Sequence, residues 1–506
     1  MAGSIGVYLP AMALQRALGL VRVLLFVHLT AGAAAQYYLW TAGEMIFIIL
    51  SPVVCLGSNS GLSRYVSFYE ARGLLRAFWR RVRWGVAGLS LALTAVAAIG
   101  GDWIRLAAVE TAGQVTAAAR SEQMLICWAA LANVLAMALW LNLMAFLYGM
   151  RVYRLASLVE LTFAVLFTAL GCAALAWSAT GLALLAAHFI SVVMAMAMGL
   201  VFLHLALAKS GTPREPHAQA APATDGPDAR DAADVAGAMA RVLGYGVVAL
   251  GPAILWSMAG YLSYRLASWR FGETAGATFQ AFNRLDQLPI LLATAAWAVV
   301  FTHVARRWED GRRGEALVTL QASYKAVAMA TMTLAVLVYL AAPWWSLLLP
   351  LRMRDGLALV GGQLMFFQVL TQLALLDLLG RLHERPVVMV LATLAGGAAT
   401  CLLAGWFMDK WGPAGAALAA GVGMYAGGGL VAAAYIRATR TALDAGTHIV
   451  FAAPAVLLLP AWAAGAASAA ACAIAVFTPW IFDAGQKKML AASVSDLLRP
   501  FARKRG

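Results

Sequence analysis

Runs of about 20 apolar residues recur along almost the whole chain, and an α-helix needs a run of about that length to cross the hydrocarbon core of a bilayer. The chain has 506 residues, of which 63% are hydrophobic and only 12% are charged. Backbone N–H and C=O groups inside a bilayer must bond to one another, which favours helices over irregular structure. The sequence therefore predicts an all-α polytopic membrane protein.

Hydropathy predicts about fourteen transmembrane helices arranged as two parallel six-helix bundles plus a C-terminal helix pair. The predicted helix limits are 5–29, 36–57, 84–104, 122–148, 155–177, 182–207, 242–264, 276–302, 326–349, 357–379, 387–407, 413–436, 449–465 and 467–483. The predicted domains are an N-terminal bundle at 1–208, a cytoplasmic linker at 209–240, a C-terminal bundle at 241–440, the additional pair at 441–484 and a basic tail at 485–506. The linker is assigned because its composition shifts to Pro, Asp, Gly and Ala without an aromatic residue.

The two halves share a basic segment after their second span. The first is "SGLSRYVSFYEARGLLRAFWRRVRW", and the second is "VFTHVARRWEDGRRGEALVTLQASYK". Each contains an aromatic residue, a glutamate and then a glycine, and each precedes the third span of its half. Six spans separate the copies, so both point the same way across the membrane, as in a transporter built from two related bundles.

The net charge of +14 is a topology signal. Most of the Lys and Arg residues fall in every second connection and in the tail, so the positive-inside rule places both termini on the cytoplasmic side. These residues then face anionic lipid headgroups, which are expected partners, and no nucleic acid is expected.

Three arginines lie inside predicted spans: Arg16, Arg22 and Arg284. Each would cost about 2.5 to 3.5 kcal/mol at a span centre, so we expect them to face water or a partner instead of lipid. Arginine grips phosphate bidentately, which makes a lipid diphosphate the expected ligand. The alternative is that these arginines pair with buried acids such as Glu44 or Asp286 and only hold the bundles together.

Polar residues in two later spans predict further cavity contacts. In "FQAFNRLDQLP", helical spacing puts four of them on one face, and a second polar face in "QVLTQLALLDLL" suggests contacts to sugars. The first set is Gln280, Asn283, Arg284 and Gln287, and the second includes Gln368, Thr371 and Gln372. Glu44 is the candidate for coupling transport to a proton or cation gradient.

No catalytic constellation is readable from the sequence. The five cysteines are dispersed in apolar runs, and the seven histidines form no metal-binding motif, so no metal and no cofactor is expected. The glycine-rich stretch "GVGMYAGGG" lacks the strand and lysine of a nucleotide loop and predicts close helix packing.

Three segments resemble the multidrug/oligosaccharidyl-lipid/polysaccharide (MOP) exporter superfamily. They are "LQRALGLVRVLLFVHL" in the first span, "GSNSGLSRYVSFYEARG" after the second, and "FNRLDQLPILLATAAWAVVFTHVARRWEDG" in the eighth. The resemblance covers roughly residues 3–440. In the lipid II flippase branch, arginines of the first and eighth spans contact the pyrophosphate, which implicates Arg16, Arg22 and Arg284. That branch commonly has an acid where this chain has Val23, so the resemblance favours flippases for polysaccharide repeat units.

The resemblance implies a non-enzymatic transporter of the bacterial inner membrane. It would move undecaprenyl-diphosphate-linked oligosaccharide to the periplasmic leaflet by alternating access, for O-antigen or exopolysaccharide synthesis, with the polysaccharide polymerase and export machinery as partners. The alternatives are a lipid II flippase, a drug/cation antiporter and a membrane-embedded glycan-processing enzyme. A cluster of arginines opposes the antiporter because it would repel a cationic drug.

Overall fold

The computed structural model describes residues 2–30, 34–110, 117–150, 152–209, 235–309, 311–383, 385 and 387–492. Most of the predicted linker and of the basic tail lies outside these residues. The described part of the chain is helical and contains no strand, which confirms the all-α prediction. It divides into two compact units, Met1–Ser257 and Met258–Gly506, whose boundary falls within one helix.

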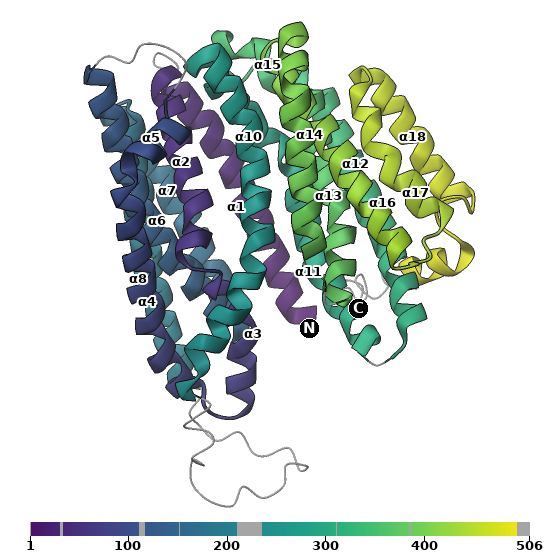
Figure 1. The fold of residues 1–506 in the computed structure, drawn as a ribbon, viewed down its shortest axis with the longest axis horizontal. Coiled ribbons are helices and arrows are strands. Elements are labelled where there is room, and N and C mark those ends of the chain that lie inside the picture. The colour runs from purple at the N-terminus through teal and green to yellow at the C-terminus, as the bar shows by residue number, and fades with distance from the viewer. Residues whose placement is uncertain are drawn as a thin grey trace, which may run out of the picture. The chain divides into compact units, whose positions relative to one another are not determined.

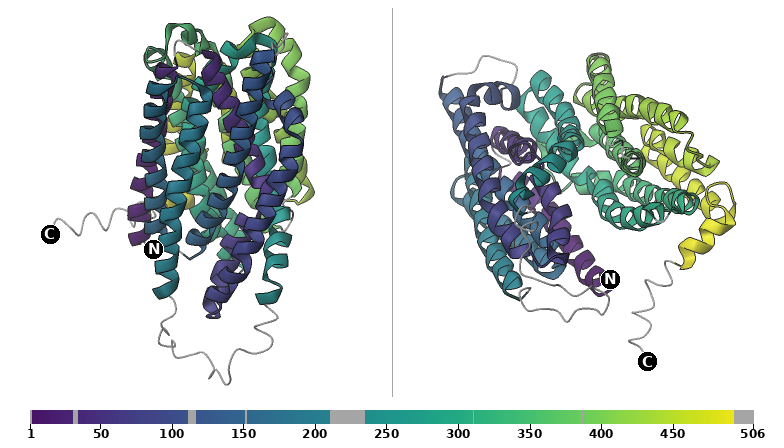
Figure 2. Two further views of the ribbon diagram at one scale, coloured as in Figure 1. Left: turned by 90° about the vertical axis from the view of Figure 1, so that its left-hand side faces the viewer. Right: turned by 60° about the horizontal axis from the view of Figure 1, so that its bottom comes forward.

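The first unit consists of long helices that pack side by side (Figures 1 and 2). Its helices are α1 (Ala2–Leu29), α2 (Ala34–Val54), α3 (Ser58–Ala71), α4 (Leu75–Ile99), α5 (Gly101–Ala108), α6 (Ala117–Gly149), α7 (Tyr153–Trp177), α8 (Gly181–Lys209) and the first part of α10 (Ala238–Asp286). Part of the segment predicted as a basic loop is helical, because α3 and the start of α4 turn apolar residues such as Leu62 and Phe78 inward.

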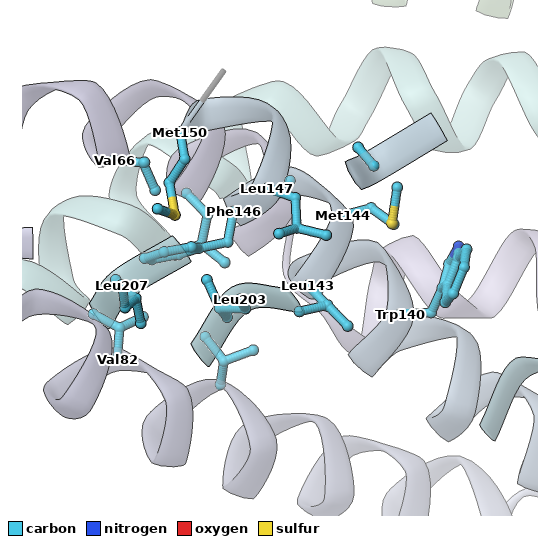
Figure 3. Close-up of a cluster of buried hydrophobic side chains, with 14 of the residues drawn as sticks. Val66, Val82, Trp140, Leu143, Met144, Phe146, Leu147, Met150, Leu203 and Leu207 are labelled. Carbon is cyan, nitrogen blue, oxygen red and sulfur yellow. The ribbon is translucent and has the colours of Figure 1, made fainter. Parts of the chain in front are cut away.

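Side chains from α3, α4, α6 and α8 form a buried cluster at one end of the first unit (Figure 3). Val66 and Val82 meet Phe146 and Leu203 there, and all four are nearly inaccessible to solvent. Arg76 of α4 lies beside the end of α8, where its guanidinium donates hydrogen bonds of 3.0 and 2.9 Å to the carbonyls of Leu207 and Ala208. A cation at the carbonyl end of a helix offsets the helix dipole, so Arg76 fixes α4 against α8.

The second unit is built around α13, whose side chains are almost all buried (Figure 1). Its elements after α10 are α11 (Leu288–Glu309), α12 (Arg313–Ser346), η1 (Leu351–Leu359), α13 (Val360–Leu382), α14 (Val387–Trp411), α15 (Pro413–Gly423), the π-helical turn η2 (Met424–Gly428), α16 (Gly429–Ala438), α17 (Ala445–Ala452), η3 (Ala453–Leu458) and α18 (Ala461–Phe477). Helices α11, α12 and α15 contact α13 directly.

Nine helices in the described ranges are long and apolar enough to cross a bilayer. They correspond to predicted spans in both halves, which confirms a polytopic membrane protein. The helix that contains the predicted ninth span is longer than the predicted limits 326–349, because α12 already begins at Arg313. The hydropathy window missed the polar first turns of this helix, which extend beyond its apolar part.

The shared basic segments of the two halves contain the same turn. Gly73 follows α3 with φ 72°, and Gly311 follows α11 with φ 78°. Each glycine N–H bonds to the carbonyl three residues earlier, and the next N–H bonds to the carbonyl five residues earlier: Leu74 to Tyr69, and Arg312 to Arg307. This pair of bonds closes a helix end when a glycine adopts a left-handed conformation. The turn supports the internal repeat at the level of backbone hydrogen bonding.

The glycine-rich stretch at 421–429 packs tightly, as the sequence predicts. A Cβ added to Gly423 would lie 2.5 Å from the backbone nitrogen of Thr400, and one on Gly427 would lie 2.3 Å from the carbonyl oxygen of Ala395. Both contacts are with α14, so α14 and the α15–η2 segment approach at backbone distance.

Gly427→Ala is expected to destabilise the second unit by about 1 to 3 kcal/mol, because the added methyl group overlaps backbone that cannot rotate away. Thermal unfolding of the detergent-solubilised protein, followed by tryptophan fluorescence, measures the effect. Gly397→Ala is the matched control, since its Cβ has no neighbour within 4 Å. Equal unfolding temperatures for the two variants would contradict the close packing.

The C-terminal helix pair has different limits from those predicted at 449–465 and 467–483. The break falls at Leu459–Pro460, because Pro460 cannot continue the preceding helix and instead caps α18. The first member consists of α17 with 8 residues and η3 with 6, and α18 has 17. Both are shorter than the roughly 20 residues that a straight span requires.

Candidate functional site

Arg22 lies on α1 of the first unit and is half-buried. Its guanidinium carbon is 4.5 Å from the ring centroid of Phe167 on α7, which is a cation–π contact. The Phe167 ring covers one side of the charge. The backbone of Arg16 belongs to the same helix, and its side chain lies outside the described part of the structure.

A buried histidine lies directly behind Phe167. His188 of α8 meets the Phe167 ring edge-on at 4.8 Å and stacks on Phe47 of α2 at 4.5 Å. Its Nδ1 is 2.6 Å from Oδ1 of Asn133 on α6. The Asn133 amide nitrogen donates to the carbonyls of Ala129 and Leu185, at 2.9 and 3.1 Å. Asn133 Oδ1 is therefore the acceptor, and the network assigns the proton to Nδ1 of His188.

This pair was not predicted from the sequence. His188 and Asn133 are 55 residues apart in different apolar spans, and neither belongs to a motif. A search for polar residues at equal depth in different spans is the only sequence signal that points to them.

His188→Phe is expected to destabilise the first unit by about 1 to 3 kcal/mol, because it leaves the buried Asn133 oxygen without its donor. The loss should appear as a lower unfolding temperature in detergent. His204→Phe is the control, since His204 is exposed on the same helix. A His188→Phe variant as stable as the control would show that the pair contributes little.

The predicted eighth span at 276–302 is two helices, so this prediction is corrected. Helix α10 bends at Gly272, where φ is 83°, and ends at Asp286, while α11 begins at Leu288. Pro289 explains the break, because it has no N–H to donate to the carbonyl of Leu285 and its ring clashes with the preceding turn. The polar segment therefore lies at a helix break.

The polar residues just before the break differ in burial. Gln280, Asn283 and Asp286 are all buried at the end of α10, and Asn283 donates to Gln280 through a 3.3 Å bond. Arg284 and Gln287 are half-buried, and Gln287 occupies the turn after α10. The predicted single face of Gln280, Asn283, Arg284 and Gln287 thus divides into a buried row, which Asp286 joins, and a more accessible flank.

Asp286 does not pair with Arg284, the candidate arginine on its own helix. Its carboxylate is fully buried, and neither oxygen has a hydrogen bond or ion pair with any described residue. The alternative that Asp286 pairs with Arg284 is therefore wrong, whereas pairing of an acid with Arg16 or Arg22 stays a prediction. Glu44 lies half-buried on α2, and its coupling role stays a prediction.

Gln368 and Gln372 are buried on α13 and brace it against neighbouring helices. Gln368 Nε2 donates to the carbonyl of Ala328 and to the Thr331 hydroxyl, at 3.0 and 3.1 Å. Gln372 Nε2 donates to the Val450 carbonyl at 2.9 Å. Their amide nitrogens thus join α13 to α12 and α17, and their role as sugar contacts stays a prediction.

A polar cluster anchors the C-terminal helix pair. Lys325 of α12 is only 1% exposed, and its Nζ donates to Asp444 Oδ2 at 2.7 Å, to the Ile481 carbonyl at 2.6 Å and to Gln486 Oε1 at 2.7 Å. Asp444 precedes α17, and the other two acceptors follow α18. One ammonium group therefore binds both ends of the pair, and all three of its donors are satisfied.

No metal site is formed by the residues whose placement is described: no three His, Cys, Asp or Glu side chains come together among them. An apolar pocket lies among α12, α17, η3 and α18, lined by residues such as Met332, Val450, Val456 and Ala471. Its wall contains no charged side chain.

Comparison of the sequence with protein-family models and with curated proteins found no match. Several solved structures are similar to the structure of this chain. An inward-facing multidrug resistance MATE family transporter of the MOP superfamily aligns with a TM-score of 0.60 at 14% identity, covering 85% of this chain and 96% of that one. Lipid II flippase MurJ aligns with a TM-score of 0.58 at 13% identity, covering 92% and 98%. A mutant of the Vibrio cholerae MATE transporter VcmN aligns with a TM-score of 0.54 at 14% identity, covering 87% of this chain and 99% of that one. Over nearly its whole length, this chain has the fold of the MOP exporters.

Proposed function

We propose that this protein is a MOP-fold flippase that moves an undecaprenyl-diphosphate-linked oligosaccharide from the cytoplasmic to the periplasmic leaflet by alternating access. The observation that carries the proposal is the pair of half-buried arginines, Arg22 on α1 and Arg284 on α10, one in each unit of an exporter fold. The planar fork of a guanidinium binds phosphate oxygens bidentately, and the diphosphate of a polyprenyl lipid is an anion carried by a membrane lipid.

Two further features support a lipid-linked substrate. The apolar pocket beside the C-terminal helix pair has the chemistry that a polyprenyl tail requires. The nearby anchoring of that pair through Lys325 keeps its helices in place without a charged group in the pocket wall.

The rival within the superfamily is a multidrug antiporter, because one of the similar structures is that of a multidrug resistance transporter. A cationic drug would be repelled by Arg22 and Arg284, so we favour the anionic lipid. Among anionic lipids, a polysaccharide repeat unit and lipid II share the diphosphate and differ in the glycan, and Val23 favours the repeat unit.

Purified protein in liposomes tests the proposal. A polyprenyl-diphosphate oligosaccharide with a fluorescent sugar is placed in both leaflets, and a membrane-impermeant quencher is added outside. Protein-containing vesicles should lose the protected inner-leaflet signal, while empty vesicles should keep it. Uptake of a cationic dye without lipid movement would instead support the antiporter.

A further inference from the structure

The Phe167 ring lies at the centre of an aromatic cluster in the first unit. Its neighbours on three other helices are Phe26 of α1, Trp40 of α2 and His188 of α8, with ring centroids 5.4, 5.5 and 4.8 Å away. Phe163, one turn earlier on α7, stacks on the ring at 5.9 Å. Phe167 itself is only 2% exposed, so its ring cannot change rotamer without displacing a packed neighbour.

Arg22 lies over this fixed ring, and a second contact one turn further along holds its helix in place. The guanidinium carbon of Arg22 is 4.5 Å from the centroid of Phe167. Phe26 follows Arg22 by one turn on α1, and Gly171 follows Phe167 by one turn on α7. A Cβ added to Gly171 would lie 2.2 Å from Cζ of Phe26, so the two helices approach closely there. Contacts in two adjacent turns therefore fix α1 against α7 at the level of Arg22.

A contact with an aromatic ring orders an arginine and keeps its capacity to bind an anion. The attraction acts between the positive charge and the electrons of the ring, so it requires no N–H···O bond. A guanidinium has five N–H donors in one rigid plane, and a bidentate grip on phosphate needs two of them to be aligned. A mobile arginine loses side-chain entropy when a ligand fixes it, whereas an arginine that is ordered beforehand loses less. The ordered guanidinium therefore binds phosphate more tightly than a mobile one.

We propose that Phe167 is a positioning residue that holds the guanidinium of Arg22 in the orientation that binds a diphosphate. The role in binding rests on the proposed flippase function, whereas the ordering of Arg22 does not. The effect of Phe167 on the ligand passes through Arg22. The pair of His188 and Asn133 contributes by holding the Phe167 ring, which His188 meets edge-on.

NMR spectroscopy of the full chain in lipid nanodiscs, with isotopically labelled arginine, tests the ordering without any substrate. The Nε–H signal of Arg22 is identified by its loss in Arg22→Lys. Protons over the face of an aromatic ring are shifted upfield by the ring current, so this signal should lie upfield in wild type and return to the ordinary position in Phe167→Leu. Phe163→Leu is the matched control, because it removes a ring from the same cluster and leaves Phe167 in place, so the upfield shift should persist. A signal at the ordinary position in wild type, or one that Phe167→Leu leaves unchanged, would overturn the proposal.

A double-mutant cycle tests the role in binding. The probe is undecaprenyl diphosphate without sugars, and its dissociation constant is measured with the purified protein in detergent. Phe167→Leu should weaken binding about 3- to 10-fold, which is the factor that ordering one long side chain costs. In the Arg22→Ala background the same change should have less than about a twofold effect, because Phe167 acts through Arg22. Equal factors in the two backgrounds would overturn the positioning role.

Two further variants separate positioning from a general loss of packing. Phe167→Tyr keeps an aromatic face, so it should retain the upfield Arg22 signal and bind the probe more tightly than Phe167→Leu does. Gly171→Ala leaves both Phe167 and Arg22 unchanged but forces Phe26 away from α7, so it should reduce the upfield shift and the affinity together. Gly88→Ala is its control, since a Cβ there has no neighbour within 4 Å. A lost shift with wild-type affinity in Gly171→Ala would show that binding does not need the ordered guanidinium and would overturn the proposal.

The two proposals fail separately. If wild type flips no lipid and binds no diphosphate but shows the Phe167-dependent Arg22 signal, the flippase proposal fails and the ordering of Arg22 stands. If wild type flips lipid and Phe167→Leu weakens binding equally with and without Arg22, the positioning role fails and the flippase stands.

Discussion

Arg284→Ala is expected to slow the flipping of a polyprenyl-diphosphate oligosaccharide about 10- to 100-fold. The loss of one charge-assisted hydrogen bond to the diphosphate costs about 1.5 to 3 kcal/mol, and about 1.4 kcal/mol corresponds to a factor of ten. Arg22→Ala should have an effect of the same order, reduced to the extent that its contact with Phe167 is structural. The initial rate of inner-leaflet fluorescence loss, at matched protein insertion, measures both.

Conservative variants separate charge from geometry. Arg284→Lys keeps the charge but loses the planar fork, so flipping should be partly restored relative to Arg284→Ala. Arg270→Ala is the control, because Arg270 is exposed on α10 and pairs with Asp409. Wild-type rates in both Arg22→Ala and Arg284→Ala would mean that these arginines do not bind the substrate.

Lys325→Met is expected to destabilise the second unit by about 2 to 3 kcal/mol. The ammonium has three acceptors at 2.6 to 2.7 Å, and removing it leaves the Asp444 carboxylate without its cation and the Ile481 carbonyl without its donor. The value lies at the lower end for a broken ion pair because Asp444 is 37% exposed and water can solvate it. The unfolding temperature in detergent should fall by several degrees, whereas Lys410→Met, at an exposed site, should leave it unchanged.

The Lys325 cluster also predicts an acid sensitivity. Burial raises the pKa of Asp444, but hydrogen bonds from Lys325, Gln486 and Thr447 outweigh it and lower this pKa to about 2. The folded-state pKa lies below the ordinary value of 3.8, so this stabilisation is complete above about pH 4 and is lost as the pH falls towards 2. Lys325→Met should lose much of that dependence; an unaltered acid profile would contradict the role of the pair.

Most of the fold was predicted from hydropathy and from the glycine that recurs in the basic segment of each half. Apolar runs identified the long helices, and the aromatic-Glu-Gly pattern marked two equivalent turns, because a left-handed position after a helix strongly favours glycine, as at Gly73 and Gly311. The predicted limits were too short where the polar first turns of a helix extend beyond its apolar part. Arg313 begins α12 well before the predicted limit for this reason.

The candidate site was predicted less completely. The segment around Arg284 was identified because polar residues at membrane depth are rare. The span was predicted as one continuous helix, whereas Pro289 interrupts it between α10 and α11. Asp286 was a possible ion-pair partner because it is an acid at membrane depth, whereas it lies buried without a partner among the described side chains. The bonds of His188 to Asn133 and of Lys325 to Asp444 join residues far apart in the chain, so only the tertiary structure brings them together.

The central claim is that the arginines select a lipid diphosphate, and the most direct measurement compares two carriers of one glycan. Wild-type protein in liposomes is given a fluorescent oligosaccharide linked to polyprenyl through either a diphosphate or a monophosphate, and the initial flipping rates are measured under identical conditions. We predict that the diphosphate-linked lipid moves at least about tenfold faster, since it offers one more phosphate for charge-assisted hydrogen bonds. Equal rates for the two carriers, or faster movement of the monophosphate, would contradict the account.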